Sequence, residues 1–268
     1  MLFMKKSNVS TMSRGYTAFT LAEVLITLGI IGIVAAMTIP TLQNNSQKTQ
    51  YVTGLKKAYS NTQQAFKMIM ADEGVNDFGY ISLFDGTSFD NPERNNKIDE
   101  LIKKFFNVIK SCKYGDASCQ IHGYKYLDGT NNGDSLSIGF IFYTADGMAF
   151  SLYLYDSCVT SPHYPEYVQI KGICGDLAVD INGIKKPNQW GRDIFSFYIG
   201  SNGSLMPRYG VDDAKFNYGA NWATQMGMMT YWQLDPYWCG ILGSSDVTGA
   251  LGWGCAARIM EDGWQMNY

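Results

Sequence analysis

A continuous apolar stretch near the start of the chain constrains this protein more than any other feature of its sequence. From Phe19 to Ile39 the only charged side chain is that of Glu23. As an α-helix this stretch reaches roughly 31 Å, which is close to the hydrocarbon thickness of a bilayer. Lys5, Lys6 and Arg14 precede it without any acidic residue, and this asymmetry places the N-terminus in the cytoplasm. The sequence therefore predicts one membrane span followed by an exported domain.

Glu23 is the unusual residue of this stretch, because a carboxylate within a span costs on the order of 3 kcal/mol on insertion scales. A cation about 4 Å from the carboxylate, at an effective dielectric constant near 20, would attract it by roughly 4 kcal/mol, which is comparable to this cost. No Lys or Arg lies between Glu23 and Lys48, so the partner must come from elsewhere. A free amine made by cleaving a neighbouring copy just before Phe19 would serve.

The segment Ala18-Phe19-Thr20-Leu21-Ala22-Glu23, followed by the apolar run and Pro40, resembles the prepilin N-terminus of type IV pilins and type II secretion pseudopilins. The resemblance implies that residues 1–18 are a leader, that a prepilin peptidase cleaves between Ala18 and Phe19, and that the new amine of Phe19 is methylated. It also implies that Glu23 pairs with that amine during assembly. Most members have glycine where this chain has Ala18, and here Gly15 lies three residues earlier.

By the same resemblance, the partners are the prepilin peptidase, copies of this chain and other pilins in a filament, and an assembly platform in the inner membrane. The expected location is the bacterial inner membrane, with a single span, a cytoplasmic N-terminus and an extracytoplasmic C-terminal domain. The subunit would enter a type IV pilus or a type II secretion pseudopilus. Two other interpretations of the N-terminus remain open: a secretory signal peptide cut near Ala35-Ala36, which leaves Glu23 unexplained, and a plain membrane anchor.

The charge balance argues against a nucleic-acid partner. The chain has 21 Lys and Arg against 24 Asp and Glu, and loss of the three leader cations lowers its formal charge from −3 to −6. Broad binding to phosphate groups requires a net positive charge, although a local basic patch is compatible with a negative total.

Six cysteines lie in the part that is predicted to be exported: Cys112, Cys119, Cys158, Cys174, Cys239 and Cys255. An even number of cysteines in an oxidising compartment favours disulfides. Because the intervening loops are short, pairing of neighbours is the simplest of the many possible connectivities. A metal site is the alternative, but the sequence has no Cys-x-x-Cys and only two histidines, His122 and His163.

Periodicity predicts an α+β, pilin-like fold, in which a long N-terminal helix packs on an antiparallel β-sheet. One helix is expected over residues 19–71, with its transmembrane half at 19–40 and a kink near Pro40, and the globular domain is expected over 72–268. A second helix is predicted between Pro92 and Lys110. Strands are predicted at residues 135–143, 148–155, 177–181, 194–199 and 204–206, the first two joined by Asp146-Gly147, and a short helix is predicted at 255–262.

The segment Val179–Asp193 resembles the Asp-x-Asn-Gly…Pro-Asn…Gly-x-Asp loop of bacterial pilin-like proteins. Some pseudopilins bind calcium in a loop of the β-region, so the resemblance implies Asp180, Asn182 and Asp193 as candidate calcium ligands. The full EF-hand spacing is absent, and the same residue types also form ordinary turns. No other cofactor is expected.

The sequence contains no His-Glu-x-x-His, no Gly-x-Ser-x-Gly and no phosphate-binding loop, so we do not expect an enzyme. A membrane-tethered, adhesin-like binding module is the alternative to a filament subunit. Its basis is the aromatic C-terminal region, where five tryptophans serve either as a sugar-stacking surface or as core: Trp222, Trp232, Trp238, Trp253 and Trp264.

Overall fold

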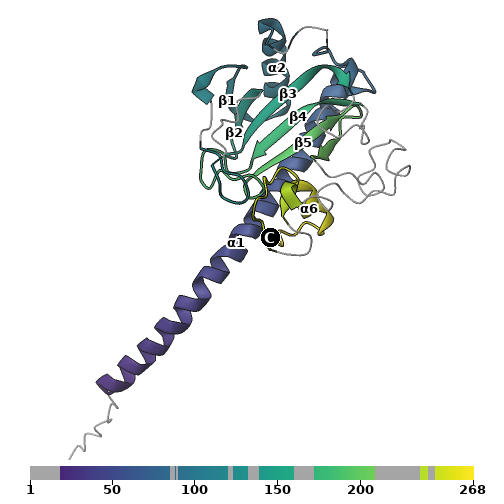
Figure 1. Ribbon diagram of the computed structural model, residues 1–268. Helices are drawn as coiled ribbons and strands as arrows, with labels where there is room; N and C mark the ends of the chain where they lie inside the picture. Colours follow the sequence, from purple (N-terminus) through teal and green to yellow (C-terminus); the bar gives the residue numbers. More distant parts are fainter. Residues whose placement is uncertain are drawn as a thin grey trace, which may run out of the picture. The chain divides into compact units, whose positions relative to one another are not determined.

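The computed structural model describes residues 19–84, 88, 90–119, 123–131, 139–159, 172–208, 236–240 and 245–268. The chain forms two compact units, divided between Ser46 and Gln47. The first contains the N-terminal part of helix α1 (Leu21–Asp72), and the second contains the rest of that helix and a six-stranded antiparallel sheet (Figure 1). The predicted α+β fold with a long N-terminal helix is therefore confirmed.

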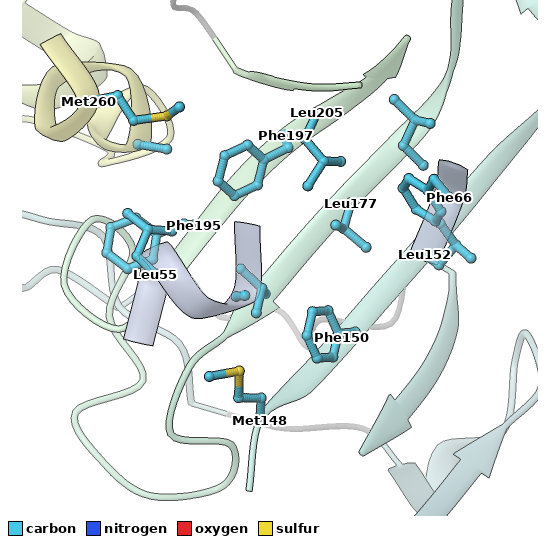
Figure 2. Close-up of a cluster of buried hydrophobic side chains, with 14 of the residues drawn as sticks. Leu55, Phe66, Met148, Phe150, Leu152, Leu177, Phe195, Phe197, Leu205 and Met260 are labelled. Atoms are coloured by element: carbon cyan, nitrogen blue, oxygen red, sulfur yellow. The ribbon is translucent and has the colours of Figure 1, made fainter. Parts of the chain in front are cut away.

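Helix α1 is continuous over Leu21–Asp72, and Pro40 lies inside it. Within the second unit its buried positions recur every three or four residues: Val52, Leu55, Ala58, Thr62, Ala65, Phe66, Ile69 and Met70. This spacing places them on one face of the helix. Figure 2 shows Leu55 and Phe66 from this face among the core side chains of the sheet.

The sheet is a meander in which each strand pairs with the next along the chain. Its strands are β1 (Val108–Cys112), β2 (Phe140–Thr144), β3 (Ala149–Val159), β4 (Ile173–Asp180), β5 (Ile194–Gly200) and β6 (Leu205–Pro207). The turn between β2 and β3 is the predicted Asp146-Gly147 hairpin, and the Thr144 N–H donates to the Met148 carbonyl at 3.0 Å. The predicted start of the first strand, residues 135–138, lies outside the described residues.

Strand register aligns large apolar side chains on the face of the sheet that α1 covers. Phe142 lies opposite Phe150, Phe150 opposite Val179, and Val179 opposite Phe195. The rings of Phe142 and Phe150 stack with centroids 4.8 Å apart. Burial of each side chain of this size contributes about 1.5–3 kcal/mol. The shared core of helix and sheet therefore accounts for much of the stability of the second unit.

The second predicted helix is shorter than expected. Helix α2 spans Pro92–Phe105, with its N-terminus capped by the side chain of Asn91, which accepts a hydrogen bond of 2.8 Å from the Glu93 N–H. The prediction that this helix continues to Lys110 is wrong, because residues from Val108 onwards form β1 and pair with β2. Ile109, which the helical pattern placed on an apolar face, is largely exposed.

The remaining elements are short and lie close to disulfides. They are the 3₁₀ helices η1 (Phe78–Tyr80) and η2 (Ala117–Cys119) and the helices α5 (Pro236–Cys239) and α6 (Cys255–Glu261). Disulfides join Cys112 to Cys119, Cys158 to Cys174, and Cys239 to Cys255. Each joins cysteines that are neighbours in the sequence, and the last one connects α5 to α6.

Candidate functional site

The first candidate site is the start of α1. Phe19 is 84% exposed and precedes the helix, while Ala18 lies outside the described residues. Thr20 and Glu23 form a reciprocal pair: the backbone N–H and the hydroxyl of Thr20 each donate to Glu23 Oε2 at 2.8 Å, and the Glu23 N–H donates to the Thr20 hydroxyl at 3.2 Å. This is a capping box, which satisfies N–H groups at a helix start. Local hydrogen bonding therefore fixes where the helix begins and leaves Phe19 outside it.

The Glu23 carboxylate has no ion-pair partner among the residues that the structure describes. Its hydrogen bonds come from the uncharged Thr20 alone. The carboxylate is thus oriented by its own helix and keeps its negative charge available for a cation from outside.

The apolar segment that follows Glu23 is exposed, and none of the residues that the structure describes covers it. Its most apolar window of 18 residues has a mean hydropathy of 2.2, and none of that window is buried. By length and composition this helix is able to cross a membrane. An apolar surface of this size needs lipid or other apolar helices as its surroundings.

The second candidate site is the loop between β4 and β5, where the structure brings the three predicted calcium ligands together. Asp193 is fully buried, and its carboxylate accepts hydrogen bonds from the Gln189 N–H (2.6 Å), the Asn188 N–H (2.9 Å) and Asn182 Nδ2 (3.1 Å). Asp180, also fully buried, accepts from the Asn182 N–H through Oδ1 at 3.1 Å. The loop therefore folds around two carboxylates rather than exposing them.

Burial raises the energy of the charged form of both carboxylates, and the Asp193 charge adds to this effect at Asp180. Burial, and then the neighbouring Asp193 carboxylate, raise the pKa of Asp180 to about 8. Burial also raises the pKa of Asp193, against the hydrogen bonds that stabilise its charge. Among the residues that the structure describes, neither carboxyl group has an ion-pair partner of the kind that normally stabilises a buried charge.

Several buried oxygens of this loop lack a hydrogen-bond partner among the described residues: Asp180 Oδ2, Asn182 Oδ1 and Asn188 Oδ1. Carboxylate and amide oxygens are the ligands that a hard cation such as Ca²⁺ prefers. The residues present therefore fit the cation that the resemblance implies. Asn188 was missed from the sequence as a candidate, although its place in the Pro-Asn pair of the motif was the available signal. The described residues contain no group of three or more His, Cys, Asp or Glu side chains arranged for a metal, so the amides are essential to this donor set.

The tryptophans proposed as an adhesive surface are only partly described, since Trp222 and Trp232 lie outside the described residues. Trp238 stacks on Trp253 with ring centroids 6.0 Å apart, and Trp190 meets Trp253 edge-on at 6.4 Å. Of the proposed residues, Trp238 and Trp253 have buried Nε1 atoms. The polar edges that a sugar would hydrogen-bond are therefore turned away from solvent.

Comparison with known proteins identifies the N-terminal site alone. Residues 13–39 match the family model described as the prokaryotic N-terminal methylation motif, which is the signature of type IV pilin and pseudopilin precursors. No curated protein and no solved structure matches the chain. The match covers the junction before Phe19, the capping pair and the apolar segment.

Proposed function

We propose that this protein is a prepilin-like structural subunit that is processed, N-methylated, and assembled through its N-terminal helix into a type IV pilus or a type II secretion pseudopilus. The observation that carries the proposal is the methylation motif at residues 13–39 on an apolar helix that nothing else in the described chain covers. A structural subunit uses such a helix first as a membrane anchor and then as the surface that packs against other subunits. Its partners are then the prepilin peptidase, other pilins and an inner-membrane assembly platform.

Processing requires an accessible junction. We place the cut between Ala18 and Phe19, with methylation on the new amine of Phe19. The exposure of Phe19 and its position before the capped start of α1 support this proposal. Cleavage there leaves the helix and its cap intact, because the hydrogen bonds of the cap join Thr20 to Glu23.

Assembly gives a role to the carboxylate of Glu23. A cationic amine of Phe19 from a neighbouring copy, about 4 Å away, would attract it by roughly 4 kcal/mol at an effective dielectric constant near 20. That is comparable to the cost of on the order of 3 kcal/mol for placing the charge in a span. Pairing between copies would therefore set the register of adjacent helices.

The proposed topology has the N-terminus in the cytoplasm and the second unit outside the inner membrane. Lys5, Lys6 and Arg14 before the apolar segment support this orientation. The three disulfides support it independently, because such bonds persist in oxidising compartments.

Intact-mass analysis of the protein extracted from membranes of its native host tests the proposal. The expected chain begins at Phe19 and carries one methyl group. A chain that begins at Met1, or after Ala36 as a signal peptide would give, contradicts it. The variant Ala18→Gly is a matched control, because the residue most members carry at this position should be processed at least as completely.

For the β4–β5 loop we propose that Asp180, Asn182, Asn188 and Asp193 hold a calcium ion. The specific support is the set of buried oxygens without partners beside two buried carboxylates. The ion would supply a positive charge directly beside the two buried carboxylates and would link β4 to β5. Calcium at 100 times its Kd should stabilise the fold by about 2.7 kcal/mol. A melting temperature that is the same with calcium and with a chelator would reject the site.

A further inference from the structure

The β4–β5 loop presents an isoleucine to solvent. Ile184 is 74% exposed, and Lys185 and Lys186 beside it are exposed as well. The base of the loop is closely packed: Gly183 has a φ of +67°, and a Cβ there would lie 2.6 Å from the carbonyl oxygen of Gly147. The apolar side chain of Ile184 therefore points away from this packed base and contributes no burial to the core of the protein.

The exposed charge of this loop has one sign. Between Ile181 and Arg192 every charged residue is a cation, and the two aspartates that border this segment, Asp180 and Asp193, are fully buried. The net charge of the whole chain is −3. A cationic surface on an acidic protein is a local feature, and it complements an anionic partner.

A fourth cation belongs to the same surface. Burial, followed by the guanidinium groups of Arg192 and Arg258, lowers the pKa of Lys48, so Lys48 lies within electrostatic range of the loop. We name Lys48, Lys185, Lys186 and Arg192 the basic surface.

Eight residues of sequence separate Pro40, at the end of the apolar segment, from Lys48 of the basic surface. A connection of this length spans at most about 28 Å even when it is fully extended, so the covalent chain itself keeps Lys48 near a membrane that contains the apolar segment. A headgroup layer is about 6 Å thick on each side of a bilayer, and the field of its charges extends about 8 Å further at physiological salt.

We infer that the β4–β5 loop contacts the surface of an anionic phospholipid membrane, with Ile184 at the boundary between headgroups and acyl chains and the basic surface against the phosphates. An exposed apolar side chain flanked by lysines is the arrangement with which interfacial segments bind such surfaces. The inference rests on membrane anchoring by α1 and does not require filament assembly.

Photocrosslinking of the full chain in bilayers tests this contact. A benzophenone amino acid replaces Ile184 in one protein and Ile109 in a control, because Ile109 is 69% exposed on the distant edge strand β1. Each protein is reconstituted in phosphatidylcholine alone or in equal parts phosphatidylcholine and phosphatidylglycerol. We expect lipid adducts at position 184 to rise at least about fivefold with the anionic lipid, the gain that one cation near such a surface gives. Equal adduct yields in the two bilayers, or equal yields at positions 184 and 109, would overturn the inference.

A double variant that carries Lys185→Glu and Lys186→Glu tests whether the positive charges of the basic surface are needed for this contact. This variant should lose the gain with anionic lipid, whereas Lys110→Glu with Lys113→Glu, which makes the same charge change on and beside β1, should keep it. Soluble glycerol phosphate, added at constant ionic strength, distinguishes contact with a membrane surface from binding of a single phosphate group in a pocket. We expect the yield of lipid adducts at position 184 to be unchanged by it. A yield that falls as glycerol phosphate is added would contradict the inference.

Discussion

The backbone N–H of Asn188 donates a hydrogen bond of 2.9 Å to Oδ2 of Asp193, so a buried carboxylate holds the middle of the β4–β5 loop. The same carboxylate accepts from the Gln189 N–H and from the side chain of Asn182. Three donors from separate positions therefore depend on one side chain. This relationship makes Asp193 the residue on which the geometry of the whole loop rests.

Asp193→Asn should destabilise the fold by about 2–4 kcal/mol, because the amide presents an N–H to backbone donors that need an acceptor. Urea unfolding followed by tryptophan fluorescence, with a chelator present, measures this change. A midpoint equal to that of the wild type would show that the loop does not depend on the carboxylate.

Asp180→Asn should behave differently from Asp193→Asn. The asparagine can still accept from the Asn182 N–H, and because the pKa of Asp180 is raised to about 8, the carboxyl group that it replaces is mostly uncharged at pH 7 in the absence of calcium. We expect a free energy of unfolding within about 1 kcal/mol of the wild type when calcium is absent. With calcium, the variant should show no rise in melting temperature. A rise as large as that of the wild type would remove Asp180 from the proposed ligands.

The elements with a clear helical or alternating pattern were predicted from the sequence with nearly correct bounds. Helix α1 and strand β5 are examples: the buried residues of α1 recur every three or four positions, and β5 is a short apolar run that is buried along its whole length. The segment after Phe105 was not predicted correctly, because its few apolar residues fit both a helical repeat and the alternation of a strand. Only its pairing with β2 makes it a strand. Sequence periodicity describes a segment alone, whereas a strand at the edge of a sheet exists through its partner.

The candidate sites likewise combine features that the sequence shows with features that depend on the fold. The capping pair Thr20 and Glu23 lies within one helical turn, so its motif is visible in the sequence. The role of Asn188 and the burial of both aspartates depend on how the loop folds back, which residue types alone do not determine. Exposure of Ile184 likewise follows from the packing of its neighbours.

Tyr268→Phe tests a long-range contact of the C-terminal segment. The hydroxyl of Tyr268 donates a buried hydrogen bond of 2.6 Å to the Gly191 carbonyl, and the Arg258 guanidinium lies 4.9 Å from the centre of its ring. Phenylalanine keeps the ring contact but leaves the carbonyl without this partner, which should cost about 1–2 kcal/mol in unfolding free energy. Tyr80→Phe is the control, because Tyr80 is 79% exposed and its change should lie within about 0.5 kcal/mol. Equal losses in the two variants would contradict the prediction.

Glu23→Gln separates the charge of this residue from its part in the helix cap. Glutamine still completes a capping box with Thr20, so α1 should begin at the same place and only the negative charge is lost. Insertion should be unchanged or slightly improved, because no charge then enters the membrane.

Assembly of the Glu23→Gln variant should fall by at least about tenfold, because the amine of a neighbouring Phe19 loses its counter-charge. The measurement is the yield of crosslinked oligomers relative to membrane-inserted monomer. Thr20→Val is the matched control: it removes the hydroxyl that receives the Glu23 N–H and keeps the carboxylate. If assembly depends on the charge, monomer accumulates in the glutamine variant while the valine variant still forms oligomers. Normal assembly of the glutamine variant, or an equal loss in both, would show that the Glu23 charge does not drive the pairing of helices.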